Sequence, residues 1–273
     1  MPAINTNVAA LFAQQSLKVN ERNQSNAMRQ LSTGSRINTA SDDAAGMAIG
    51  QNMTSQVKGL NQAVRNVNDG INMMQTAEGA LGETSNMLQR MRELAVQSSN
   101  GTYSTTQRTY LQTEFLALSS QIDKIATDTK WNDTNLLLTA ATTFTYQAGK
   151  DTGQTVAVTI GAMTLAGLAI PGTTTSIGNV TGATASLALL DSAIGTVNAQ
   201  RATIGAGINQ MTYAADNLSN VAANVAASRS AIMDTDYATA STQLSRTQII
   251  QQAATAMLAQ ANQQPQSVLA LLK

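Results

Sequence analysis

The stretch LNQAVRNVNDGINMMQTAEGAL, residues 60–81, decides the fold, because apolar residues recur in it every seven positions. The repeat forms one seam, whose members are Leu60, Val67, Met74, Leu81, Leu88 and Ala95. An alternate seam begins with Val57, Val64 and Ile71 and then drifts onto Met87, Met91 and Leu94. A heptad sustained over this length predicts one long helix over about 41–99, which Asn100-Gly101 would end.

A second heptad runs through the later part of the chain, on Leu190, Val197, Ile204, Met211, Leu218, Val225 and Ile232. Between the two heptads, Ser104 and Gln107 form a capping-box pattern, which predicts a shorter helix from Ser104 to about Thr129. Residues 143–146 and 155–160 alternate with period two and predict a β-hairpin, followed by a Thr- and Gly-rich loop to residue 184. In the second heptad, Gly205 and Gly207 are expected to allow close helix approach.

These elements predict a mainly α fold, an elongated antiparallel helical bundle or coiled coil with a small β-hairpin. We divide the chain into three parts. Residues 1–40 and 235–273 form the two halves of a terminal coiled-coil domain, and residues 41–234 form a helical rod with the hairpin near 142–160.

The composition excludes several classes of function. Sixteen Lys and Arg balance sixteen Asp and Glu, so the basic surface of a nucleic-acid binder is absent from the sequence. There is no Cys and no His, which excludes thiolate nucleophiles, Ser-His-Asp triads and His-Cys zinc sites. No Gly-rich phosphate loop occurs either. We therefore expect no enzyme, no cofactor and no metal site. No window approaches the roughly 18–20 apolar residues of a membrane span, so membrane insertion is not expected.

The two ends of the chain are apolar but almost free of charge: residues 1–17 and 247–272 carry none. Their apolar residues are Ile4, Val8, Leu11, Phe12, Ile250, Met257, Leu258, Val268, Leu269, Leu271 and Leu272. Neither end has enough apolar residues for a core of its own, so both are expected to fray in the monomer.

Two short segments, STGSRINTASDDAAG (32–46) and RSAIMDTDYATA (229–240), connect these ends to the heptads. Their acids, Asp42, Asp43, Asp234 and Asp236, stand where helices begin and are expected to act as caps. A second interpretation pairs Arg36 with Asp43 to fix the angle between end and rod.

Four long motifs closely resemble bacterial flagellin: QLSTGSRINTASDDAAGMAIG (30–50), residues 60–81, LQRMRELAVQSSNGT (88–102) and QIIQQAATAMLAQANQQPQSVLALLK (248–273). The resemblance covers about 3–140 and 185–273. It implies a hairpin-shaped subunit of a helical filament of identical copies, in a short form without large outer domains. Together with the lack of charge at both ends, it implies that the apolar residues of the ends mediate polymerisation and become ordered among identical copies. It also implies an extracellular protein of the flagellum, exported through the flagellar secretion channel without a cleaved signal peptide.

The resemblance implies further partners: other flagellins, a filament cap, hook-junction proteins, an export chaperone and the host Toll-like flagellin receptor. The residues that match the receptor patch are Gln89, Arg90, Leu94 and Glu114, although Leu94 also lies on the core seam. Ser35 stands where the family usually has Leu, which is expected to loosen packing at that turn. Alternative functions are a hook–filament junction protein and a secreted helical adhesin with a Thr-rich surface over 139–184.

Overall fold

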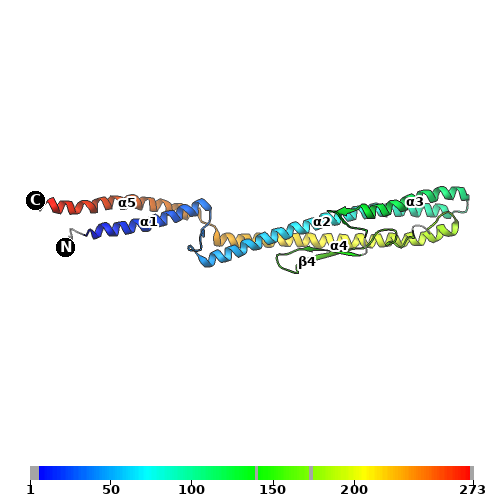
Figure 1. Cartoon of the computed structure of the whole chain (residues 1–273), viewed down its shortest axis with the longest axis horizontal. Helices are drawn as coiled ribbons and strands as arrows, with labels where there is room; N and C mark the ends of the chain where they lie inside the picture. The colour runs from blue at the N-terminus through cyan, green and yellow to red at the C-terminus, as the bar shows by residue number, and fades with distance from the viewer. Residues whose placement is uncertain (1–5, 139–140, 172–174, 271–273) are drawn as a thin grey trace. The chain divides into compact units, whose positions relative to one another are not determined.

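The computed structural model describes residues 6–138, 141–171 and 175–270, with side chains to residue 263. Helices dominate these residues, and two small antiparallel sheets accompany them, which confirms the predicted mainly α fold (Figure 1). The chain divides into two compact units. The central unit spans Lys58–Ala222, and the terminal unit combines the residues up to Val57 with those from Ala223 onward.

The central unit is built on helices α2 (Ala44–Ser99) and α4 (Val180–Met233). The main seam of α2 is buried as the heptad predicts, and so are Leu190, Val197, Ile204 and Met211 of α4. The alternate seam differs from the prediction. Val64 and Ile71 are only half-buried, whereas Met91 and Leu94 are buried as predicted. Other buried positions are smaller residues in a seven-residue spacing with Met91: Ala63, Gly70, Ala77, Thr84 and Ser98. Small side chains on this seam leave space for the elements that pack against α2.

Helix α3 (Thr105–Asp128) begins with the predicted capping box. The Ser104 hydroxyl accepts from the Gln107 amide at 3.3 Å, and the Gln107 side chain accepts from the Ser104 amide at 2.9 Å. The apolar stripe of the helix buries Phe115 and Ile122 completely. A short ribbon follows, β1 (Lys130–Trp131) paired with β2 (Thr134–Asn135).

The predicted hairpin is present as β3 (Thr142–Gln147) paired antiparallel with β4 (Thr155–Ile160). The hairpin packs closely against α2 and α4 at one glycine of each helix. A Cβ atom on Gly70 of α2 would lie 2.8 Å from Tyr146 of β3, and one on Gly207 of α4 would lie 2.6 Å from Val158 of β4. Gly205 has no such neighbour within 4 Å, so only one of the two glycines expected to allow close approach does so, and it receives a strand rather than a helix.

The segment after the hairpin is more apolar in its packing than the predicted Thr- and Gly-rich loop. Its described part buries five apolar side chains, those of Met163, Leu165, Leu168, Ile170 and Ile177. The Asp123 carboxylate of α3 accepts from the Leu165 amide at 2.8 Å. The segment therefore covers the core as an irregular layer, because its apolar residues are spaced without a regular period.

One helix of the described chain, α4, is long and apolar enough to cross a membrane by length and composition, with a mean hydropathy of 1.3 over its most apolar window. The expectation that no window approaches a membrane span was therefore too strict. The buried heptad of α4 accounts for part of this apolarity, because Leu190, Val197 and Ile204 face the protein core. A core helix passes the same test of length and composition.

The terminal unit contains α1 (Val8–Thr33) and α5 (Tyr237–Ala270), which lie side by side (Figure 1). Asn7 caps α1, and its side chain accepts from the Ala10 amide at 3.1 Å. Within the two chain ends, residues 8–33 and 237–270 are helical, and each helix supplies the other with a partner that neither could provide alone. The fraying of the ends in the monomer stays a prediction.

Candidate assembly surface

The interface between α1 and α5 is built from small and polar residues. The residues buried on α1 are Ala10, Asn20 and Ala27, and those buried on α5 are Ala240 and Thr247. The Asn20 side chain donates to the Thr247 carbonyl at 2.7 Å, and Asn7 donates to the Ala261 carbonyl at 2.8 Å. Few large apolar side chains are buried between α1 and α5, so most of those on the two helices are not used in the contact between them.

The larger apolar side chains of the same helices face outward. Phe12 is 71% exposed, and Ile249 and Met257 are each 66% exposed. Smaller but substantial exposure is found at Val8, Leu11, Val19, Met28 and Ile250. An apolar surface of this kind on a helix pair marks an interaction site.

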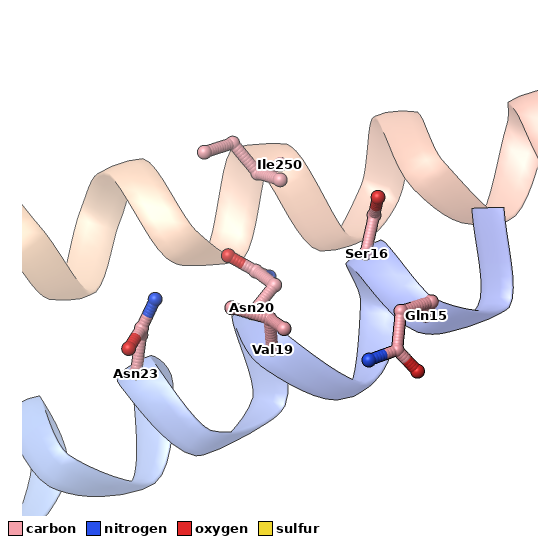
Figure 2. Close-up of a pocket in the computed structure, with 6 residues that line it drawn as sticks. All are labelled: Gln15, Ser16, Val19, Asn20, Asn23 and Ile250. Atoms are coloured by element: carbon pink, nitrogen blue, oxygen red, sulfur yellow. The ribbon is translucent and has the colours of Figure 1, made fainter. Parts of the chain in front are cut away.

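A shallow open depression of about 310 Å³ lies between the two helices (Figure 2). Five of its lining residues come from α1 and one from α5: Gln15, Ser16, Val19, Asn20, Asn23 and Ile250. Four of the six side chains carry an amide or hydroxyl group, and none of the six is charged. The depression therefore suits an uncharged polypeptide surface better than a charged ligand.

The sequence-predicted polymerisation residues divide into four groups. Val8, Leu11, Phe12, Ile250 and Met257 are exposed on the helix pair, and Leu258 is half-buried. Ile4, Leu271 and Leu272 lie outside the described residues, and the side chains of Val268 and Leu269 are not described. Sequence reasoning missed Val19, Met28 and Ile249, which lie on the same helices. Continuing the apolar pattern past residue 17 would have found Val19 and Met28, whereas Ile249 lies inside the uncharged segment 247–272.

A joint of backbone hydrogen bonds connects the two chain segments of the terminal unit. Gly34 takes the left-handed conformation (φ 70°) after α1, and Ser35 forms an antiparallel bridge with Asp234. The Arg36 amide donates to the Met233 carbonyl at 2.6 Å, and the Thr235 amide donates to the Gly34 carbonyl at 3.0 Å. The peptide units themselves therefore hold the two segments together.

The predicted pairing of Arg36 with Asp43 is wrong. The Arg36 guanidinium donates instead to the Ile232 carbonyl, with Nη2 at 2.6 Å. This carbonyl lies near the end of α4, where carbonyl groups lack helical partners and attract cations. Asp43 accepts from the Gly46 amide at 2.8 Å in the first turn of α2.

The acids of the two connecting segments take two different roles. Asp43 and Asp236 cap α2 and α5 as the sequence predicts. Asp42 accepts from amides that precede it, and Asp234 accepts from a hydroxyl group of α4, so the prediction that these two cap helices is wrong. Asp42 accepts from the Asn38 and Thr39 amides at 3.1 and 2.9 Å, and hydrogen bonding from the Thr39 backbone lowers its pKa. Asp236 accepts from the hydroxyl of Thr239 at 2.8 Å and from the Ala238 amide, and the Thr239 bond lowers its pKa. Asp234 accepts from the Ser230 hydroxyl at 2.6 Å. None of the described residues forms a His, Cys, Asp or Glu group suited to a metal ion.

The residues of the predicted receptor patch fall into two environments. Arg90 of α2 forms ion pairs with Glu114 of α3 at 2.9 Å and with Glu93 at 3.0 Å, and Gln89 is exposed beside it. These carboxylates, Glu114 first, raise the pKa of Arg90. Leu94 is only 1% exposed and packs in the core. This burial agrees with its predicted position on the drifting seam of α2.

These features define a class of protein, a mainly helical one in which the terminal helices α1 and α5 pair and present apolar side chains outward. The comparisons give the family. Residues 4–142 match the bacterial flagellin N-terminal helical region, and residues 187–272 match the bacterial flagellin C-terminal helical region. The chain belongs to the bacterial flagellin family.

Individual relatives agree with this assignment. The chain is 40% identical over 270 residues to a flagellin of Halalkalibacterium halodurans, and 39% identical over 284 residues to the flagellar filament 33 kDa core protein of Treponema phagedenis. Each match covers 99% of both chains, in keeping with a short flagellin. The crystal structure of Bacillus cereus flagellin resembles it with a TM-score of 0.51 and 34% identity, over 56% of this chain and 88% of that one.

Proposed function

We propose that this chain is a structural subunit that polymerises with identical copies into the filament of a bacterial flagellum. The observation that supports this most directly is the outward-facing apolar surface of α1 and α5, represented by Phe12, Ile249 and Met257. Contacts between different patches of identical subunits repeat without closing, and such contacts build an open helical polymer.

The lack of charge on this surface fits a polymer of identical copies. No charged residue occurs between Thr247 and Leu272. In a helical polymer each charge would lie near symmetry copies of itself, and burial of an unpaired charge is costly. Glutamine, asparagine and alanine carry no charge and so avoid this repulsion, while still packing or forming hydrogen bonds.

Elongation of filament seeds by the purified monomer tests this proposal. The natural chain should elongate them. Phe12→Asp should not, because the variant places a charge in the assembly surface, yet its helix content should be unchanged because Phe12 is 71% exposed. Phe12→Leu is the matched control and should elongate the seeds. If Phe12→Asp elongated the seeds at the natural rate, the apolar surface around Phe12 would not take part in polymerisation.

The same assay addresses the alternatives. A hook–filament junction protein would cap seeds without growing long filaments, and a secreted adhesin would neither cap nor elongate them. The remaining partners that we propose are other flagellins, a filament cap, hook-junction proteins and an export chaperone. Export through the flagellar channel to the cell exterior, without a cleaved signal peptide, belongs to the same proposal.

We also propose that the monomer is recognised by the host Toll-like flagellin receptor through Gln89, Arg90 and Glu114. The support is the exposed ion pair between α2 and α3, which presents Arg90 in a fixed orientation. Arg90→Ala should lower receptor activation. Arg92→Ala is the matched control, because Arg92 lies on the same helix but pairs with Asp191 of α4 at 2.6 Å. Equal activation by both variants would contradict the proposal.

A further inference from the structure

The turn between α2 and α3 holds a buried arginine whose hydrogen bonding is incomplete. Arg108 is only 6% exposed, and its Nη2 donates to the Asn100 carbonyl at 2.9 Å and to the Tyr103 carbonyl at 3.1 Å. Nη1 is buried with no partner among the described residues. A buried cation that faces neutral carbonyls and keeps one donor unpaired is poorly compensated, and a carboxylate would satisfy it far better.

Asn100, which supplies one of these carbonyls, is followed by Gly101, and the two form the only Asn-Gly pair in the sequence. Asn100 is exposed, and its Oδ1 accepts from the Thr102 amide at 3.2 Å. This bond folds the carboxamide back over the following peptide, as in other Asx-turns. The Gly101 amide donates to no acceptor among the described residues, so its nitrogen is free to react.

From this geometry we infer that Asn100-Gly101 is a site of spontaneous deamidation whose isoaspartyl product is held by Arg108. The Gly101 nitrogen loses its proton to solvent base and attacks Cγ of Asn100. A C–N bond forms, the bond from Cγ to the side-chain nitrogen breaks, and ammonia leaves a cyclic succinimide. The Thr102 amide stabilises the negative oxygen that develops at Oδ1.

Water then opens the succinimide at one of its two carbonyl carbons. Attack at Cγ gives aspartate. Attack at the former main-chain carbonyl carbon gives isoaspartate, and that carbon becomes a free carboxylate. It derives from the same carbonyl that Arg108 Nη2 contacts at 2.9 Å. The new carboxylate offers Arg108 an anionic partner with a second oxygen for Nη1, so the folded protein favours the isoaspartyl product.

Glycine 101 provides a clean control. Its backbone is outside the left-handed region, and a Cβ atom added there meets nothing within 4 Å. Gly101→Ala therefore fits without strain and slows attack by its added side chain. After incubation of the natural chain at mildly alkaline pH, peptide mapping and isoaspartyl methyltransferase labelling should find isoaspartate at 100 before any other asparagine reacts. Gly101→Ala should lose this signal.

The role of Arg108 is tested by the ratio of isoaspartate to aspartate at position 100. This ratio should be higher in the folded protein than in the same protein incubated in denaturant, and Arg108→Lys should lower it towards the denatured value. If Arg108→Lys does not fold, the comparison of folded and denatured natural protein still tests whether the folded structure around Arg108 raises this ratio. Equal ratios would overturn the role of Arg108, and an unmodified Asn100 would overturn the whole inference.

Discussion

Gly34, at the residue scale, combines an unusual backbone conformation with a close neighbour. It ends α1 at φ 70°, with its amide donating to the Gln30 carbonyl at 2.9 Å. A Cβ atom there would lie 3.0 Å from the Tyr237 hydroxyl. An L-amino acid other than glycine pays a steric cost in this conformation, so the position explains why the chain has a glycine after α1.

Gly34→Ala should destabilise the terminal unit by about 1–2 kcal/mol, because the left-handed conformation places Cβ against the backbone. Thermal and urea unfolding followed by circular dichroism would measure the change. Gly79→Ala in α2 is the control. Nothing lies within 4 Å of its added Cβ, and it should stabilise the protein by about 0.5–1 kcal/mol through the better helix propensity of alanine. If Gly34→Ala and Gly79→Ala changed the free energy of unfolding by the same amount and in the same direction, this account would be contradicted.

Residue-level prediction from sequence succeeded where a local rule applies. Asp43, Asp236 and Ser104 cap helices because their side chains accept from amides two or three residues further along the chain. Gln107 completes the capping box of Ser104. The prediction for Arg36 failed because its acceptor, the Ile232 carbonyl, is 196 positions away in sequence. A main-chain carbonyl has no signature in the side-chain pattern, so only the folded chain could identify this partner.

At the scale of elements, the hairpin and the two helices meet at glycines. Gly207 lies directly beneath Val158, and Gly205, two positions away on the same helix, has open space around it. The pair therefore separates the effect of close packing from the effect of helix propensity.

Gly207→Ala should destabilise the central unit by about 1–3 kcal/mol, because the new methyl group would overlap Val158 and push β4 off the helix. Gly205→Ala should instead stabilise it by about 0.5–1 kcal/mol, as expected of alanine in a helix. Urea unfolding of the two variants beside the natural chain makes the comparison. If both substitutions stabilise, the hairpin does not pack against α4 as described.

The hairpin also predicts a pH dependence at Tyr146. Burial raises the pKa of Tyr146 from 10.0 to about 12, and its hydroxyl donates to Met73 Sδ at 3.4 Å. The unfolded chain loses this proton at lower pH than the folded chain, so stability is present below pH 10 and falls as pH rises towards 12. Tyr146→Phe should show a smaller loss of stability over this range. The same slope in both proteins would exclude Tyr146 as its source.

Among the elements, the heptads, the capped α3 and the hairpin could all be predicted because each has a sequence period. The second buried seam of α2 could not. Val64 and Ile71 drew attention by their size, yet the structure buries Ala63, Gly70 and Ala77. Where a neighbouring strand lies close to a helix, the space left for a side chain decides burial, and that space is a tertiary property.

At the scale of the whole molecule, the two units differ in where their large apolar side chains lie: many are exposed in the terminal unit, and many are buried in the central unit. The central unit buries Met74, Leu81, Leu88 and Phe115 completely. The pair α1 and α5 buries mainly alanine and polar side chains. The two units should therefore respond differently when the end of the chain is removed.

Deletion of residues 259–273 should abolish seed elongation while the helices of the central unit still melt as in the natural chain. The deleted stretch carries a single charge, at Lys273, so added salt should not restore assembly. Circular dichroism and electron microscopy of the truncated protein would test both parts. Loss of most helix in the truncated protein would show that the central unit depends on the tail.

The joint formed by Gly34, Ser35 and Arg36 has a practical consequence for labelling. Its backbone bonds to Met233 and from Thr235 do not use the side chain of Ser35, so the replacement of the family's usual leucine leaves them in place. The chain contains no cysteine. A single thiol introduced at this position would accept one fluorophore, and its emission would report the ordering of the chain ends as copies join.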